Sequence, residues 1–259
     1  MRLTAAGRTD AGLVRSANED RFLVLPDSGI FLVADGIGGH PAGEVASELA
    51  VRIISRSVGS LRALSAEAAS DRVRAALGTA NDAILERAGS EPEKCGMGTT
   101  ATVLALFEGG YCIGYVGDSR AYLFRAGRLV RLTRDHSCVE ELVEAGLLTP
   151  HQARAHPLRN VITRWLGACE EIVPDVQVGT LEVGDTLLLA SDGLTEMVDD
   201  EELARILGSG AGPREQVDRM IAAANDRGGL DNITAVVVRT EAGICSFRAP
   251  PAPPWSCRP

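Results

Sequence analysis

Residues 30–39 read IFLVADGIGG. The unbroken apolar run from Ile30 to Ala34 indicates a buried β-strand, because β-branched and aromatic residues follow one another without polar alternation. Gly36, Gly38 and Gly39 then break the strand into a loop. Asp35 therefore stands where a buried strand meets a glycine-rich loop.

Helices are expected after this loop, because apolar residues recur at helical spacing from Ala42 to Val58 and from about Glu67 to Ala88. Residues 99–133 instead contain short β-rich runs divided by glycine-containing turns, which predicts an antiparallel meander. Its expected strands are 102–107, 111–116, 121–124 and 129–132. The other expected elements are strands 186–190 and 233–238 and helices 201–207 and 215–225.

This order lacks the strict strand–helix alternation of a doubly wound parallel sheet and favours an α+β fold with antiparallel sheets covered by helices. Residues 136–175 are helical and loop-like between two strands, and we interpret them as a flap insertion. The chain beyond Ala249 is too rich in proline to continue a core element. We therefore expect one domain over residues 1–240 and a proline-rich tail over 241–259.

The composition narrows the class of protein. The 259 residues suit one large domain, and the formal net charge of -9 argues against nucleic-acid or anionic-membrane binding. Six scattered cysteines without a C-x-x-C pair predict neither a disulfide framework nor a zinc site. With no charged-then-apolar leader and no apolar stretch of membrane-spanning length, we expect a cytoplasmic protein.

Four aspartates share one kind of position. Asp35, Asp118 and Asp192 follow apolar strands, whereas Asp231 precedes one, and each is followed by Gly, Ser or Asn. Any one of them could be an ordinary turn residue. In an antiparallel sheet, however, the start of one strand lies beside the end of its neighbour, so the four could converge on one edge.

Converging carboxylates repel one another unless a cation compensates them, and oxygen ligands suit hard divalent ions. Because no thiolate or imidazole cluster accompanies the aspartates, they indicate Mg²⁺ or Mn²⁺ and argue against zinc. Two such ions roughly 3.5 to 4 Å apart can activate water for attack on a phosphoryl group. The pattern thus predicts a phosphoester hydrolase.

Two further residues fit this chemistry. The guanidinium of Arg15 can bind phosphate oxygens in a bidentate manner, although most arginines are solvated surface residues. His40 directly follows the glycine run and is the best-placed histidine to protonate a departing alkoxide, although it could equally be a polar loop residue.

Other phosphate-handling sites fit poorly. A cysteine-dependent phosphatase needs an arginine six residues after its cysteine, which none of the cysteines has. An aspartyl-phosphate enzyme needs a second aspartate where Ile37 stands. The glycine run lacks the G-x-G-x-x-G spacing of a dinucleotide loop, and Asp35 at its head would repel pyrophosphate.

The candidate residues fall within seven short motifs. In order these are GLVRSANED (12–20), VADGIGGHPAGE (33–44), GTTA (98–101), GDSR (117–120), DHS (135–137), SDGL (191–194) and DNIT (231–234). Together they resemble the ordered motifs of the PP2C (PPM) family of metal-dependent protein phosphatases, in its compact bacterial form, over about residues 3–240. The order of seven motifs makes the resemblance specific, whereas a single Asp-Gly pair would not.

The resemblance implies a four-layer α/β/β/α sandwich of two antiparallel β-sheets flanked by helices, with a binuclear Mn²⁺ or Mg²⁺ centre at one sheet edge. Asp35 would bridge both ions, and the Gly36 carbonyl would ligate one of them. Asp192 and Asp231 would ligate the other ion. Asp118, together with Asp192, would hold a third and weaker ion.

The resemblance also implies that Asp20 acts through metal-bound water, that Arg15 binds the substrate phosphate and that His40 is the general acid. We therefore expect a monomeric protein serine/threonine phosphatase that acts on phosphoserine and phosphothreonine proteins, with a Ser/Thr kinase as a further partner. The alternative is a metal-binding regulatory module that sequesters a phosphoprotein without turnover.

Overall fold

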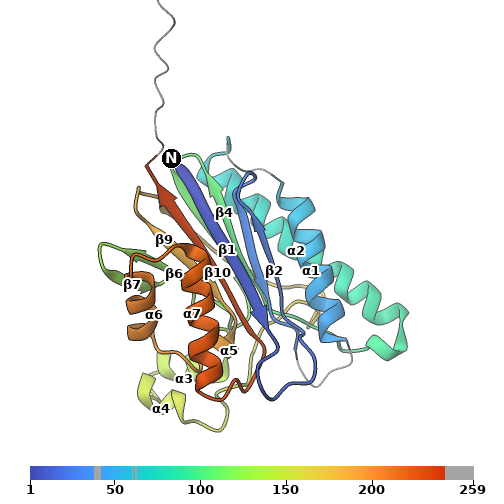
Figure 1. Cartoon of the computed structure of the whole chain (residues 1–259). Coiled ribbons are helices and arrows are strands. Elements are labelled where there is room, and N and C mark those ends of the chain that lie inside the picture. The colour runs from blue at the N-terminus through green and yellow to red at the C-terminus, as the bar shows by residue number, and fades with distance from the viewer. Residues whose placement is uncertain (38–41, 60, 62, 243–259) are drawn as a thin grey trace, which may run out of the picture.

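Two five-stranded antiparallel β-sheets form the centre of the computed structural model, which describes residues 1–37, 42–59, 61 and 63–242 (Figure 1). Sheet A has the order β1 (Arg2–Asp10), β10 (Ile233–Glu241), β9 (Thr186–Ala190), β6 (Arg120–Arg125) and β7 (Arg128–Arg131). Sheet B has the order β2 (Arg21–Leu25), β3 (Ile30–Ala34), β4 (Ala101–Phe107), β5 (Gly110–Val116) and β8 (Asp175–Thr180).

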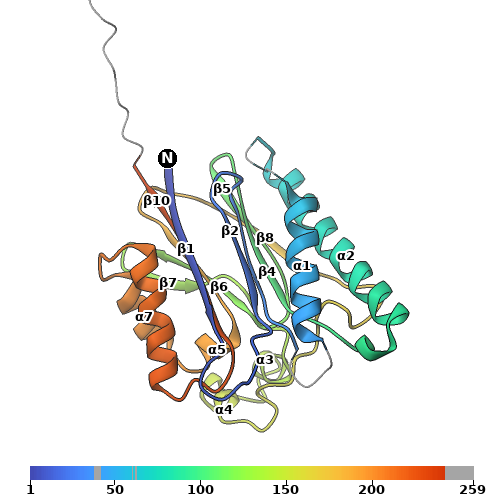
Figure 2. The ribbon, with the colours of Figure 1, turned by 45° about the vertical axis from the view of Figure 1, so that its right-hand side comes forward.

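Helices cover the outer face of each sheet (Figure 2). The long helices α1 (Gly43–Val58) and α2 (Ala66–Ser90) pack against sheet B, and a short 3-10 helix, η1 (Pro92–Lys94), follows them. Sheet A is covered by α5 (Asp192–Thr195), α6 (Asp200–Leu207) and α7 (Pro213–Asp226). The expected four-layer α/β/β/α sandwich is confirmed.

Burial on two faces explains why the central strands are apolar throughout. In β3, Ile30, Leu32 and Ala34 join the core beneath α1 and α2, whereas Phe31 and Val33 join the core between the sheets. β9 and β10 divide in the same way between the inter-sheet core and the core beneath α5 to α7. Because successive strand residues point to opposite faces, a strand inside a four-layer sandwich needs apolar residues at every position.

The expected strands and helices agree with the structure, and β3 has the expected bounds. Sequence reasoning missed β1, β2 and β8, and all three are edge strands. Their side chains are only partly buried or exposed. β1 lacks a clear pattern, whereas the apolar run from Phe22 to Leu25 in β2 and the alternating Val176 and Val178 in β8 were signals that sequence reasoning did not use.

The segment interpreted as a flap contains two short helices, α3 (Cys138–Glu144) and α4 (Pro150–Arg154), at one end of the sheets (Figure 1). Its first and last residues meet, because His136 Nε2 lies 3.0 Å from Asp175 Oδ2. Asp175 is also the first residue of β8.

Strand β10 runs to Glu241, one residue into the expected tail, and residues 243–259 lie outside the described part of the chain. Among the described helices, none combines the length and apolar character needed to cross a membrane.

Candidate active site

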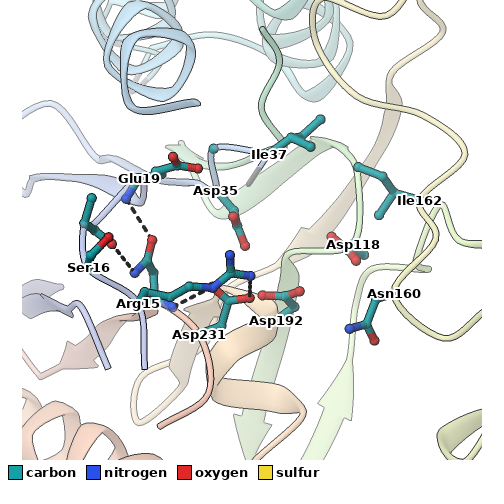
Figure 3. A pocket seen from close by; sticks show the side chains of 13 residues that line it. Arg15, Ser16, Glu19, Asp35, Ile37, Asp118, Asn160, Ile162, Asp192 and Asp231 are labelled. Atoms are coloured by element: carbon teal, nitrogen blue, oxygen red, sulfur yellow. Dashed lines mark hydrogen bonds and ion pairs between the residues drawn. The ribbon is translucent and has the colours of Figure 1, made fainter. Parts of the chain in front are cut away.

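A cavity of about 330 Å³ opens at the end of the two sheets where β3 ends and β10 begins. Asp35, Asp118, Asp192 and Asp231 all line it, and their carboxylates are directed toward a common space (Figure 3). The four aspartates therefore converge as predicted, but at one end of both sheets and not on the edge of a single sheet, since Asp35 follows β3 of sheet B and Asp192 follows β9 of sheet A. Further lining residues are Arg15, Ser16, Ala17, Glu19, Gly36, Ile37, Asn160, Ile162 and Asn232.

The GTTA motif holds Asp35 in place. Thr100 Oγ1 accepts a hydrogen bond from the Asp35 N–H at 3.1 Å, and the Asp35 carbonyl accepts from the Thr100 N–H and the Thr99 hydroxyl, both at 2.8 Å. Gly36 must be glycine, because a Cβ there would lie 2.5 Å from the Gly43 carbonyl oxygen. The end of β3 is thus rigid where it enters the cavity.

The GDSR motif is joined to the same scaffold. Ser119 Oγ lies 2.9 Å from Thr100 Oγ1, and the Thr102 hydroxyl donates to the Ser119 carbonyl at 2.7 Å. On its other side, the Gly117 N–H donates to His136 Nδ1 at 3.1 Å. Asp118 lies between these two anchors, so its position depends on both β4 and the base of the flap.

The SDGL and DNIT motifs approach each other closely. α5 begins at Asp192, and a Cβ on Gly193 would lie 2.1 Å from the Asn232 carbonyl oxygen. No larger residue fits at 193 without moving the loop of Asp231. This contact brings the start of α5 and the start of β10 together at the cavity.

Asp20 is fully buried and is not among the residues that line the cavity. Its Oδ2 accepts hydrogen bonds from the hydroxyls of Ser191 at 2.8 Å and Thr234 at 2.6 Å. Its Oδ1 has no hydrogen-bond partner among the described residues. Burial raises the pKa of Asp20 to about 7, against the lowering effect of these two hydroxyls. A buried carboxylate oxygen without a partner fits a site that receives a cation.

The pKa values of three aspartates that line the cavity are raised as well. Burial raises the pKa of Asp35 and Asp118 well above the ordinary value, and it also raises the pKa of Asp192. Neighbouring aspartates add to each shift, since like charges in one cavity oppose ionisation. A divalent cation would relieve this repulsion, so the donor set fits Mg²⁺ or Mn²⁺.

Within the described residues, no three side chains of His, Cys, Asp or Glu are arranged so that they alone could hold one ion. The Asp231 carboxylate is engaged by Arg15, whose Nη2 donates to Asp231 Oδ2 at 2.7 Å (Figure 3). Mg²⁺ commonly binds through one or two carboxylates and keeps several waters. The arrangement therefore suits an ion that draws on backbone oxygens and water as well as carboxylates.

Arg15 lies in the loop between β1 and β2 and lines the cavity with its side chain about half exposed. The hydrogen bond that Arg15 donates to Asp231 raises the pKa of the guanidinium, which is therefore charged. Arg15 thus places a cation at the mouth of an acidic cavity. His40, the other candidate catalytic residue, lies outside the described residues.

Sequence reasoning assigned no role to Asn232, which connects the two loops of the site. Its Oδ1 accepts the Glu19 N–H at 2.8 Å, and its Nδ2 donates to the carbonyls of Ala11 at 3.1 Å and Ala17 at 2.8 Å. One nearly buried amide thereby holds both ends of the loop that carries Arg15. The sequence signal for a role of Asn232 was its position directly after Asp231 in the DNIT motif.

Glu19 is a second residue without an assigned role, and it lines the cavity. Burial and the nearby Glu44 carboxylate raise its pKa, so Glu19 is a further acidic side chain whose ionisation is opposed by its surroundings. It directly precedes Asp20 in the GLVRSANED motif, which was the signal for its position.

Comparisons with known proteins agree with this geometry. The family model described as protein phosphatase 2C matches residues 14–233. A protein of Listeria monocytogenes named serine/threonine phosphatase stp is 41% identical over 238 residues, which cover 90% of this chain and 94% of that protein.

Among solved structures, the Mycobacterium tuberculosis serine/threonine phosphatase PstP/Ppp aligns with a TM-score of 0.85 and 36% identity, covering 93% of this chain and all of that one. The catalytic domain of a phosphatase named PstP, in complex with two manganese ions, aligns with a TM-score of 0.83 and 34% identity, covering 93% and 99%. The chain belongs to the protein phosphatase 2C family.

Proposed function

We propose that this protein is a metal-dependent protein serine/threonine phosphatase that hydrolyses phosphoserine and phosphothreonine. The observation that carries the proposal is the convergence of Asp35, Asp118, Asp192 and Asp231 on one cavity beside the guanidinium of Arg15. Carboxylates that hold cations, next to a phosphate-binding arginine, suit attack of water on a phosphoester. Family membership and the names of the relatives support the same activity.

The ions we propose are two Mn²⁺ or Mg²⁺, and the solved PstP complex with manganese supports this. When bound, they would neutralise the acidic cavity and lower the pKa of water so that it can attack phosphorus. We assign Asp35 and the Gly36 carbonyl to the first ion and Asp35, Asp192 and Asp231 to the second. Asp20 would act through metal-bound water.

Asp118 is proposed to hold a third and weaker ion together with Asp192. Both carboxylates line the cavity, and the Asp192 charge raises the pKa of Asp118. This coupling supports a cation between them.

Arg15 is proposed to bind and orient the substrate phosphate. Its position at the cavity mouth lets a planar guanidinium approach two phosphate oxygens. His40 is proposed to protonate the departing serine or threonine oxygen; this role rests on its place in the sequence after the glycine run.

The expected setting is the cytoplasm, with the protein acting as a monomer on phosphoproteins and working against a Ser/Thr kinase. Cys95, Cys112, Cys138 and Cys169 are all free thiols, which supports a reducing compartment.

Release of inorganic phosphate from a phosphothreonine peptide tests the proposal. The full chain with Mn²⁺ or Mg²⁺ should turn over many equivalents of peptide. A regulatory module that sequesters phosphoproteins would bind the peptide and release no phosphate with either metal, and that result would overturn the proposed function.

A further inference from the structure

A second cavity, of about 450 Å³, adjoins the first. The two cavities share Asp118 and Asp192. On one side the second cavity is lined by α3 and α4 of the flap, and on the other by Met197, the start of α6 and Leu230. We call this cavity the flap groove. It is larger than the proposed catalytic cavity and opens directly from it.

Four of the charged residues that line the groove pair with one another. Asp135 pairs with Arg120 at 2.7 Å and with Arg131 at 2.6 Å. Arg131 also lies 3.7 Å from Glu140. Paired charges have little left to offer a ligand. Arg154, Arg159 and Glu196 line the groove as well, so its walls combine charged side chains with apolar ones.

Apolar side chains line the groove from several elements. Val139 and Val143 of α3, one turn apart, line the groove together with Met197 and Leu230, and Leu230 is 53% exposed. Neither α3 nor α4 contains a fully buried residue, whereas α1 and α2 bury seven each. The apolar face of α3 is therefore left without a core to pack against.

The chemistry of the adjoining cavity indicates what fills the groove. If the phosphate of a phosphoserine or phosphothreonine binds near Asp35 and Arg15, the short side chain brings the polypeptide to the cavity mouth. Each neighbouring residue of an extended chain then advances by about 3.3 Å. Two or three residues therefore carry the chain roughly 7 to 10 Å from the phosphorylated residue, into the groove that begins at Asp118 and Asp192.

We propose that the flap groove receives the polypeptide segment beside the phosphorylated residue and binds an apolar side chain of that segment against Val139 and Val143. The inference rests on the proposed function and gives it a substrate preference. The enzyme then favours phosphoproteins with an apolar residue within three positions of the phosphorylated one, on one side only.

Phosphothreonine peptides test this preference. A single leucine is moved through the three positions before and the three after the phosphothreonine in a glycine–serine background, and kcat/KM is measured with Mn²⁺. The wild type should gain about tenfold at one or two positions on one side, since burying part of a leucine side chain is worth that much. Val143→Glu should remove the gain.

Hydrolysis of a small aryl phosphate serves as the internal control, because that substrate does not reach the groove. Val143→Glu should keep its aryl phosphate kcat/KM within about twofold of the wild type. Leu147→Glu is the matched variant: Leu147 follows α3, is 69% exposed and does not line the groove. It carries the same new charge on the same flap and should keep the leucine preference.

Two outcomes overturn the inference while leaving the phosphatase intact: no leucine position raises kcat/KM in the wild type, or Val143→Glu retains the full gain. Failure of the proposed function looks different, because the wild type would then hydrolyse neither the peptides nor the aryl phosphate.

Discussion

Arg15 and Asp231 form an ion pair at 2.7 Å across the mouth of the acidic cavity. Their loops are also joined through the backbone, where the Leu13 N–H donates to the Gly229 carbonyl at 2.7 Å. A phosphate and a metal ion that bind here act on the two halves of this pair. Under the proposed roles, phosphate would compete with Asp231 for the guanidinium, and the metal would compete with Arg15 for the carboxylate.

Arg15→Ala should therefore raise KM for aryl phosphate roughly tenfold or more with a smaller change in kcat, because a charge-assisted hydrogen bond to phosphate is lost. Mn²⁺ binding, measured by calorimetry, should be unchanged or tighter, since Asp231 loses a competing cation. Arg15→Lys keeps the charge without the bidentate geometry, so its KM should lie between those of the wild type and Arg15→Ala. Weaker Mn²⁺ binding in Arg15→Ala would contradict this competition.

Asn232→Ala should loosen the loop that carries Arg15. Loss of the amide leaves the Glu19 N–H and two carbonyls without their partner, which should lower the free energy of unfolding by about 1–3 kcal/mol and raise KM. Asn81→Ala is the matched control, because Asn81 is also buried and bonds to loop backbone at Gly167 and Cys169. It should lower stability without raising KM. Equal KM changes in both variants would argue against a specific role for Asn232.

Asp20→Asn should stabilise the metal-free protein at neutral pH. The folded-state pKa of Asp20, about 7, exceeds the unfolded value of about 3.9, so the unfolded state releases its proton first as pH rises. The stability that protonated Asp20 contributes is therefore fully present below about pH 4 and is lost as the pH rises to about 7.

Asparagine does not titrate, so Asp20→Asn does not lose stability over this pH range. In urea denaturation with EDTA it should exceed the wild type by a few kcal/mol at pH 7.5, with the difference shrinking toward pH 4. Asp71→Asn, at an exposed position of α2 where the aspartate pairs with Arg74, serves as the control for replacing an aspartate by asparagine. A constant difference between Asp20→Asn and wild type at all pH values would refute the account of Asp20.

His136 should make the protein sensitive to mild acid. Burial lowers the pKa of His136, whose Nδ1 accepts the Gly117 N–H and whose Nε2 faces Asp175. A depressed folded-state pKa gives stability that is present above the unfolded value of about 6.5 and is lost as pH falls below it. His136→Phe keeps a ring against Tyr115 but cannot titrate.

The difference in urea midpoint between wild type and His136→Phe should therefore shrink from pH 7.5 to pH 5.5. At pH 7.5 the variant should be less stable by about 1–3 kcal/mol, because the Gly117 N–H loses its acceptor. If the difference between the two proteins does not change with pH, the histidine does not titrate as described.

The sequence predicted the central strands because they are buried on both faces. The run from Ile30 to Ala34 can be recognised as a strand without knowing which strands lie beside it. Three of the four edge strands, β1, β2 and β8, were missed, whereas the edge strand β7 was predicted within the meander. The side chains of the missed strands are only partly buried or exposed, so their patterns are weaker than those of the central strands. Long-range pairing, such as Arg2 with Glu241, is not visible in local pattern.

The residues of the site also divide into those that could be predicted from the sequence and those that could not. Asp35 and its companions could be found because strand ends with small neighbours repeat four times along the chain. The residues that hold them could not, because Thr100 reaches Asp35 across 65 positions and Asn232 reaches Glu19 across 213. Such contacts follow from the sandwich, which places motifs that are distant in sequence at one edge.

Hydrolysis of an aryl phosphate with Mn²⁺, measured for wild type and Asp192→Asn with and without EDTA, tests the central claim most directly. The claim is that the converging aspartates bind the ions that activate water. It predicts steady turnover in wild type, its loss with EDTA and its return with added Mn²⁺, and turnover at least about a hundredfold lower in Asp192→Asn at matched metal. Wild-type turnover that persists in EDTA, or full activity in Asp192→Asn, would contradict it.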